Sequence, residues 1–367
     1  MLHRKLSYAG LCSQAEPAGS TSAAARQIDV VCGLVILVCL ISAYTCTYGR
    51  IIGHAQPLSV CVNLSYLSLQ SFFAIAAYQL VREVSGHRDW ARYTIARLMR
   101  FVPAVVPAVL VAYVLVTQAS IPQLHADATA LLANLLMAAD FFGMPDFDGA
   151  FWRLKIEVMF AAAFGIAWFG LGARWAMGML VAGLALCALQ AHGDPVRQTR
   201  ISPSGLLTMD GYLPHLTIGI AAFHLAAGKH RGLWWLLAGV SGLIVMASNT
   251  LEHGLAVLMA YSVVGAAAHG ALPMLAPLGW LAAIGRAFFS IYLLHQALGF
   301  VVIHWLEAQG VPPLPAVMAA CGAAILCGVT MHRYSTQTAQ QFYQRSFHCF
   351  WVEKAKPLYQ PAFGLEQ

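Results

Sequence analysis

The chain is built from apolar runs long enough to cross a lipid bilayer. Hydrophobic residues fill 59% of its 367 positions and charged residues only 10%, whereas a soluble domain carries roughly 25% charged residues. A membrane-spanning helix needs about 20 mostly apolar residues. Runs of about that length fall at 28–48, 58–81, 101–120, 152–171, 175–191, 211–228, 232–248, 254–270, 284–306 and 314–332. The sequence therefore predicts an all-α, polytopic membrane protein with about ten transmembrane helices.

The placement of Lys and Arg residues predicts the orientation of these helices, because short cytoplasmic loops are enriched in both. With the N-terminus inside, only a minority of the 21 basic residues face outward, namely Arg50, Arg153, Lys155, Arg197 and Arg200. Both termini are then cytoplasmic. A further short apolar run, 131–142, would invert every later loop if it also crossed, so we expect it to be re-entrant or interfacial at the outer face.

The domain organisation follows from the same pattern. Residues 1–26 are polar and rich in Ala and Ser, which predicts a disordered cytoplasmic N-terminus. Residues 27–333 form the predicted transmembrane domain, and 334–367 a cytoplasmic tail. The net charge of +6 resides in short loops and indicates membrane lipid rather than nucleic acid as the partner.

The nine cysteines fall mostly inside apolar runs. Cys32, Cys39 and Cys46 repeat every seven residues and so lie close to one helix face, where we expect them to pack against a neighbouring helix. No CxxC or Cys/His zinc spacing occurs, so no metal site is expected.

Arg97 and Arg100 stand three residues apart before an apolar run that contains Pro103 and Pro107. On a helix that enters the membrane they share a face. Two guanidiniums there would bind phosphate groups, and the prolines would disturb the helix beside them. The alternative is a positively charged anchor at the lipid headgroups.

Glu157 follows Trp152 into an apolar helix. A carboxylate at that depth needs a partner. Arg153, one turn earlier, would provide a local ion pair. In the functional interpretation, Glu157 instead orients or deprotonates a reacting group, or holds a catalytic His. Trp152 by itself is typical of the aromatic belt at a membrane surface.

Tyr292 and His295 lie three residues apart on one face of the predicted helix 284–306. His295 is near the middle of this apolar run, where it is either a packed, hydrogen-bonded histidine or a group that handles protons. Tyr292 supplies a hydroxyl beside it, and Gly285 and Ser290 keep the preceding turn narrow enough for close helix approach.

Together these three segments resemble the acyltransferase-3 family of integral-membrane acyltransferases. The family's Arg-x-x-Arg motif, followed by Pro, matches Arg97 to Pro103. Its Trp-x-Leu-x-x-Glu motif matches Trp152 to Glu157, and its Ser-x-Tyr-Leu-x-His motif matches Ser290 to His295. The Leu-Asp opening of its first helix corresponds to Ile28-Asp29. The resemblance covers about residues 27 to 335.

The first helix departs from the family pattern at two positions. The family normally has Arg where Cys32 stands, and a His, the family's catalytic base, where Ala43 stands. His54 is the next His downstream, past the expected helix end. The second helix reads Ser71-Phe72-Phe73-Ala74-Ile75-Ala76-Ala77 in place of the family's usual Phe-Phe-x-x-Ser-Gly motif.

The resemblance implies an O-acyltransferase of the inner (plasma) membrane. It would move an acetyl or another short acyl group from acyl-CoA, a donor substrate rather than a bound cofactor, to a hydroxyl of an exported glycan or lipid-linked sugar. Glu157 and His295 are the predicted catalytic residues, and Arg97, Arg100, Trp152 and Tyr292 the predicted substrate-binding residues. The alternative is a catalytically degenerate member that serves as a scaffold or subunit beside proteins of glycan synthesis or export.

Overall fold

The computed structural model describes residues 22–58, 60–87, 89–119, 121, 123–124, 127–137, 139, 149–190, 209, 211–228, 230–339 and 341–342. Within these ranges all regular secondary structure is helical, as predicted. The elements are α1 (Ser22–Ser42), η2 (Ala43–Thr47), α2 (Tyr48–Ile51), α3 (Ser65–Gly86), α4 (Trp90–Ala119), α5 (Ala128–Leu135), α6 (Phe151–Ile166), η4 (Ala167–Leu171), α7 (Ala173–Gln190), α9 (Leu213–Ala226), α10 (Arg231–Ala247), α11 (Leu251–Ala268), η5 (Pro273–Leu275), α12 (Gly279–Arg286), α13 (Phe288–Ala308), α14 (Pro313–Met331) and η6 (His332–Gln337).

Seven helices of the described chain are long and apolar enough to cross a membrane. They are Ala23–Ile51, Trp90–Ala119, Phe151–Leu171, Ala173–Gln190, Leu251–Ala268, Phe288–Ala308 and Pro313–Gln337. The other three predicted runs are also helical, as α3, α9 and α10. The multi-pass architecture therefore agrees with the sequence, while the number of ten spans and the cytoplasmic termini stay predictions.

The short run 131–142 forms no long helix in its described part. Helix α5 has eight residues and is about 12 Å long at 1.5 Å per residue, too short to cross the bilayer. The carboxylate of Asp127 caps its N-terminus by accepting a 2.6 Å hydrogen bond from the backbone N–H of Ala130. That bond, followed by the one from the Thr129 hydroxyl, lowers the pKa of the exposed Asp127.

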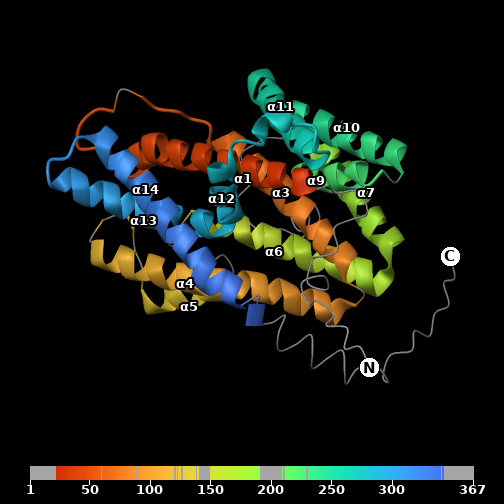
Figure 1. The fold of residues 1–367 in the computed structure, drawn as a ribbon, viewed down its shortest axis with the longest axis horizontal. Helices are drawn as coiled ribbons and strands as arrows, with labels where there is room; N and C mark the ends of the chain where they lie inside the picture. The colour runs from red at the N-terminus through yellow and green to blue at the C-terminus, as the bar shows by residue number, and fades with distance from the viewer. Residues whose placement is uncertain are drawn as a thin grey trace, which may run out of the picture.

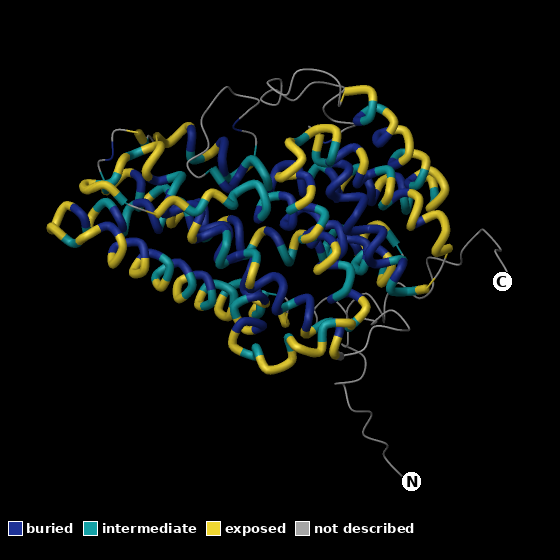
Figure 2. Tube along the Cα trace, turned by 90° about the horizontal axis from the view of Figure 1, so that it is seen from above, coloured by how far each residue is buried: buried dark blue, intermediate teal, exposed yellow. Residues whose placement is uncertain are grey.

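Buried positions gather in the middle of the molecule, and exposed positions follow the outer sides of the peripheral helices (Figure 2). Many exposed positions are apolar. On α10, for example, Trp235 is 64% and Leu243 72% exposed. Water would disfavour such a surface and lipid accepts it, so these faces are suited to contact the acyl chains of a bilayer.

Small residues allow the central helices to approach closely. A Cβ atom added at Gly33 would overlap the backbone of Leu281, and one at Gly285 would overlap the carbonyl of Asp29. These two glycines join α1 to α12, as expected for Gly285. In the same way Gly219 of α9 lies against Ala74 of α3. Backbones in lipid associate through such close packing, and Figure 1 shows α12 lying against α1.

The basic segment 82–100 is not the loop that the sequence predicted. Helix α3 continues to Gly86 and α4 begins at Trp90, so Arg97 and Arg100 lie two to three turns inside α4. Pro103 and Pro107 lie within the same helix and do not end it. Both arginines therefore face helix neighbours rather than a flexible loop.

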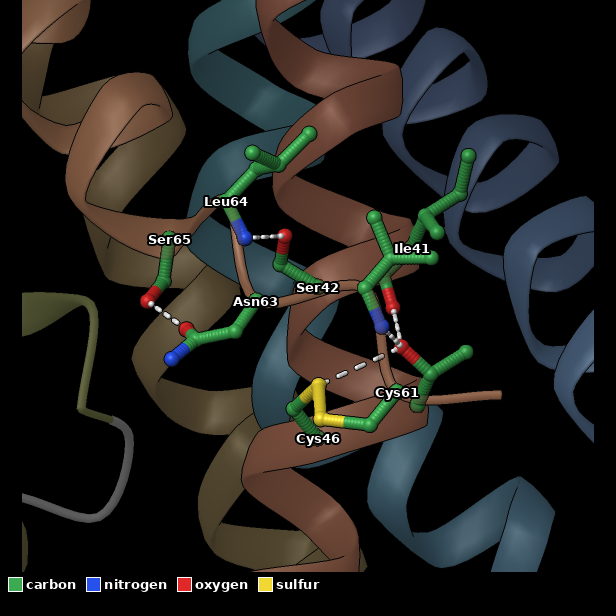
Figure 3. The surroundings of a disulfide bond; sticks show 9 residues. Ile41, Ser42, Cys46, Cys61, Asn63, Leu64 and Ser65 are labelled. Carbon is green, nitrogen blue, oxygen red and sulfur yellow. Dashed lines mark hydrogen bonds between the residues drawn. A yellow bond between two sulfur atoms is a disulfide. The ribbon is translucent and has the colours of Figure 1, made fainter. Parts of the chain in front are cut away.

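A disulfide bond joins Cys46 of η2 to Cys61, which precedes α3 (Figure 3). Beside it, the backbone N–H of Leu64 donates to the hydroxyl of Ser42 over 3.0 Å, and that of Val62 donates to Thr45 over 3.2 Å. The expectation that Cys46 merely packs against a neighbouring helix was therefore wrong, because its sulfur is covalently bonded.

Candidate active site

Arg97 lies between two carboxylates from different helices. Its two terminal nitrogens donate to Glu83 of α3 over 2.7 Å and to Glu157 of α6 over 2.9 Å. The predicted local pair with Arg153 is not the ion pair that Glu157 makes in the described structure. Arg97 and Glu157 are 8% and 6% exposed, and a charge this deep in a membrane fold is tolerated only because it is paired.

Arg100, one turn further along α4, completes this group. Its guanidinium donates to the second oxygen of Glu83 and to the side-chain oxygen of Gln79. Its side chain is 25% exposed, compared with 9% for Arg97. We call Gln79, Glu83, Arg97, Arg100 and Glu157 the arginine cluster. Two guanidiniums and two carboxylates make it electrically balanced.

A second group of polar residues surrounds His295. The Nδ1 of His295 lies 2.6 Å from the carbonyl oxygen of Tyr292, and the Tyr44 hydroxyl donates to the carbonyl of His295 itself over 2.6 Å. The ring of Tyr292 stacks beside the imidazole with 5.3 Å between centroids. The Tyr292 hydroxyl donates to the carbonyl of Ala150 over 3.3 Å. His295 is thus buried and held by contacts from η2 and α13.

The second ring nitrogen of His295 faces a thiol. The Nε2 of His295 lies 3.7 Å from the sulfur of Cys39 on α1. A carbonyl oxygen can only accept, so the hydrogen bond to Tyr292 places the proton of a neutral imidazole on Nδ1. Nε2 then offers its lone pair to the thiol. Cys39 and His295 are 6% and 3% exposed.

Arg153 and Trp152 extend this group toward α6. The guanidinium carbon of Arg153 lies 5.3 Å from the Trp152 ring centroid and 5.7 Å from that of Tyr292. The charge of Arg153 acts on both Tyr292 and Cys39, and its Nε atom is buried with no hydrogen-bond partner in the described structure. We call Cys39, Tyr292, His295, Arg153 and Trp152 the histidine cluster.

Helix α6 connects the two clusters. Arg153 and Glu157 are four residues apart on it and so lie on one side of the helix, with Arg153 in the histidine cluster and Glu157 in the arginine cluster. The three sequence motifs, on α4, α6 and α13, therefore contact one another in the interior of the protein. Both His295 and Glu157 are buried.

His54 does not replace the histidine that the first helix lacks at Ala43. Its Nδ1 pairs with Glu307 over 2.6 Å, and Glu307 also accepts from the backbone N–H of Ala55 over 2.8 Å. Glu307 lies twelve residues beyond His295 on α13, which is about 18 Å along the helix. His54 therefore stands at the far end of α13 and does not occupy the place of the missing His near Ala43.

Sequence reasoning missed Glu83, Gln79 and Cys39 as members of the site. Glu83 and Gln79 were partly detectable, because they stand four residues apart on one helix face at the start of the basic segment 82–100. Cys39 was recognised only as one of three cysteines in a seven-residue repeat. Its partner is 256 positions away, and no local pattern encodes that contact.

The apolar helical fold and its buried, paired polar groups define a multi-pass membrane protein with an internal site that contains an imidazole. A family model described as an acyltransferase domain (Acyl_transf_3) matches residues 31–333. The chain belongs to this acyltransferase family, as its three sequence motifs indicated. No curated protein and no solved structure matches it. Family and fold together support a membrane acyltransferase.

Proposed function

We propose that the protein is an O-acyltransferase of the cell inner membrane, moving an acetyl or another short acyl group from acyl-CoA to a hydroxyl of an exported glycan or lipid-linked sugar. The observation that carries this proposal is the contact network of His295. Its Nδ1 is fixed by the Tyr292 carbonyl and its backbone by the Tyr44 hydroxyl, so that Nε2 is oriented as a base.

Acyl transfer needs a group that removes a proton from the attacking atom and returns it to the leaving group. His295 is suited to that role because an imidazole exchanges protons near neutral pH. Tyr292 and Trp152 would line the place where the acyl group is presented. Arg153, with a buried N–H that has no partner in the described structure, would stabilise the oxyanion that forms at the acyl carbonyl.

In this proposal the two cluster arginines have different roles. Arg97 is held on both sides by carboxylates, and Glu157 is thus a positioning residue that fixes α4 against α6. Arg100 is the more exposed of the two. It would exchange its contacts with Glu83 and Gln79 for the phosphates of CoA, which a guanidinium binds well.

A second candidate function, a scaffold within a glycan export or modification complex, is favoured by two specific observations. The family's first-helix Arg and His are Cys32 and Ala43 here, and Arg97 and Arg100 already have carboxylate partners inside the protein. A protein that had lost its chemistry would retain such internal pairs for stability alone.

The acyl-ester content of the host's exported glycans separates the two functions. A deletion strain would be complemented with the wild type, with His295→Ala, or with His304→Ala as a matched control on the same helix. Loss of ester on deletion, restored by the control but not by His295→Ala, is the result expected for the enzyme. Restoration by both variants would overturn the enzyme in favour of the scaffold, and no loss on deletion would contradict the proposed acceptor.

A further inference from the structure

The geometry points to Cys39 as a catalytic nucleophile that carries the acyl group as a thioester between donor and acceptor. This inference rests on the proposed function and adds a covalent step to it. Cys39 lies in none of the three sequence motifs that resemble the family. Cys39 lies on α1, contacts His295 and is close to the charge of Arg153.

The position of Cys39 corresponds to one turn before that of the missing base. Cys39 and Ala43 are four residues apart on one continuous helical segment, Ala23–Ile51, so both face the same side. Ala43 has no group that can take or give a proton. The thiol of Cys39 is the reactive group that this face of α1 offers to His295.

The contact of Cys39 with His295 has the arrangement that activates a thiol. The Sγ–Nε2 separation is 3.7 Å, and Nδ1 is occupied by the Tyr292 carbonyl, so Nε2 accepts the proton of the thiol. A nucleophile, an adjacent base, and a third group that orients the base are the parts that nucleophilic catalysis requires. In this cluster they are Cys39, His295 and the Tyr292 carbonyl.

The surroundings of the pair also suit an acyl intermediate. The charge of Arg153 acts on Cys39, and its unpartnered Nε–H is a donor available to an oxyanion. Both members of the pair are buried. Burial protects a thioester from hydrolysis until an acceptor hydroxyl arrives.

The two half-reactions balance. In the first, the Cys39 sulfur attacks the thioester carbonyl of acyl-CoA while His295 Nε2 takes the thiol proton. The carbon–sulfur bond to CoA then breaks, and the imidazolium protonates the CoA thiolate. In the second, His295 takes the proton of the acceptor hydroxyl, whose oxygen attacks the Cys39 thioester, and the departing Cys39 thiolate recovers that proton. No oxidant or reductant is needed.

The test uses the full-length protein purified in lipid nanodiscs, with radiolabelled acetyl-CoA and propionyl-CoA as probes and no acceptor. We expect acid-stable label on the wild type that neutral hydroxylamine removes, and exchange of labelled CoA into acyl-CoA. Peptide mapping should place the label on Cys39. Cys187→Ala, which removes another buried helical cysteine, should retain both signals.

Three variants keep the result interpretable. Cys39→Ala should lose label and exchange by at least 100-fold while it elutes as a folded protein in gel filtration. Cys39→Ser should bind label as an oxygen ester that neutral hydroxylamine does not remove. His295→Gln should slow labelling without moving it to another residue.

The possible failures are distinguishable. Wild-type protein that transfers acyl groups to glycan but shows neither label nor exchange would overturn the covalent step and leave the proposed function intact. Full transfer by Cys39→Ala would do the same. A wild type that esterifies no glycan and takes no acyl group from either probe would overturn both proposals.

Discussion

At the scale of single residues, the site depends on contacts between side chains that are distant in sequence. The motifs around Arg97, Glu157 and His295 could be identified from the sequence because residue type and spacing define them. The partners of His295 could not, since Cys39 and Tyr44 reach it through tertiary packing, and for Arg97 only Glu83, beside the basic segment, gave a partial local signal. The local candidate partner of Glu157, Arg153, instead lies over aromatic rings.

The arginine cluster allows a stability prediction from charge balance. Arg97→Met leaves Glu157 buried without its cation, and breaking such a pair costs about 3–5 kcal/mol. The double variant Arg97→Met/Glu157→Gln removes both charges and retains the pair of Arg100 with Glu83. We expect the single variant to lower Tm strongly and the double variant to recover most of the loss.

Thermal unfolding of detergent-solubilised protein, followed by gel filtration, measures this recovery. Glu252→Gln is the matched control, because Glu252 is exposed at the start of α11 and should leave Tm nearly unchanged. If the double variant were less stable than Arg97→Met, charge balance would not be what stabilises the cluster.

At the scale of elements, the sequence predicted the apolar runs well and their ends less well. All ten runs are helical, because lipid requires backbone groups to be satisfied within each segment. The residues at which the helices end depend on contacts with other helices, which the local sequence does not show. Helix α3 extends to Gly86 because its last turn carries Glu83 to Arg97. The run 284–306 is divided at Ala287 into α12 and α13.

Gly299 of α13 determines how closely η2, which continues α1, approaches His295. A Cβ atom there would overlap the ring of Tyr44, whose hydroxyl holds the carbonyl of His295. We expect Gly299→Val to push α1 outward, at a cost of about 1–3 kcal/mol for overpacking, and to reduce glycan esterification. Gly322→Val is the control, since Gly322 of α14 has open space around its Cβ position.

Esterification by the two variants, normalised to the amount of folded protein, measures the effect. A reduction confined to Gly299→Val supports the role of close α1–α13 packing in positioning His295. Equal activity of the two variants would show that this contact does not orient the imidazole.

The disulfide between Cys46 and Cys61 should stabilise the connection from α2 to α3. It closes a loop with a sequence separation of 15 residues, for which the chain-entropy model gives about 3 kcal/mol. We expect Cys61→Ser, or reduction of the wild type, to lower Tm, whereas Cys321→Ser should not. Alkylation of denatured, unreduced protein should leave both cysteines unmodified, and their full alkylation would contradict the bond.

At the scale of the whole molecule, two contacts constrain how often the chain crosses the membrane. Gln27, near the start of α1, bonds to Gly270 over 3.1 Å and to Leu272 over 2.9 Å, just after α11. At the other end of the helices, His54 and Ala55 contact Glu307, near the end of α13. Each pair of helix ends must therefore lie on one side of the membrane.

These contacts require an even number of crossings between their partners. In the described part of the chain, the helices long enough to span between Gln27 and Gly270 are Ala23–Ile51, Trp90–Ala119, Phe151–Leu171, Ala173–Gln190 and Leu251–Ala268, which is an odd number. Among the described helices, we therefore expect one or all three of α3, α9 and α10 to cross as well. With its 22 residues, α3 is about 33 Å long, enough for a bilayer core. Crossing by all three gives the ten spans expected from the sequence.

The ten-span topology predicts which surface positions meet the outside. We expect Gln56→Cys and Gln309→Cys, each in a background with reactive native cysteines replaced, to be labelled in intact cells by a membrane-impermeant maleimide. Arg92→Cys and His269→Cys should be labelled only after lysis. The side that carries Gln56 also carries the disulfide, which persists in an oxidising compartment. Labelling of Gln56→Cys and Gln309→Cys on opposite sides would contradict the even count, and exposure of His269→Cys in intact cells would invert the orientation that the basic loops predict.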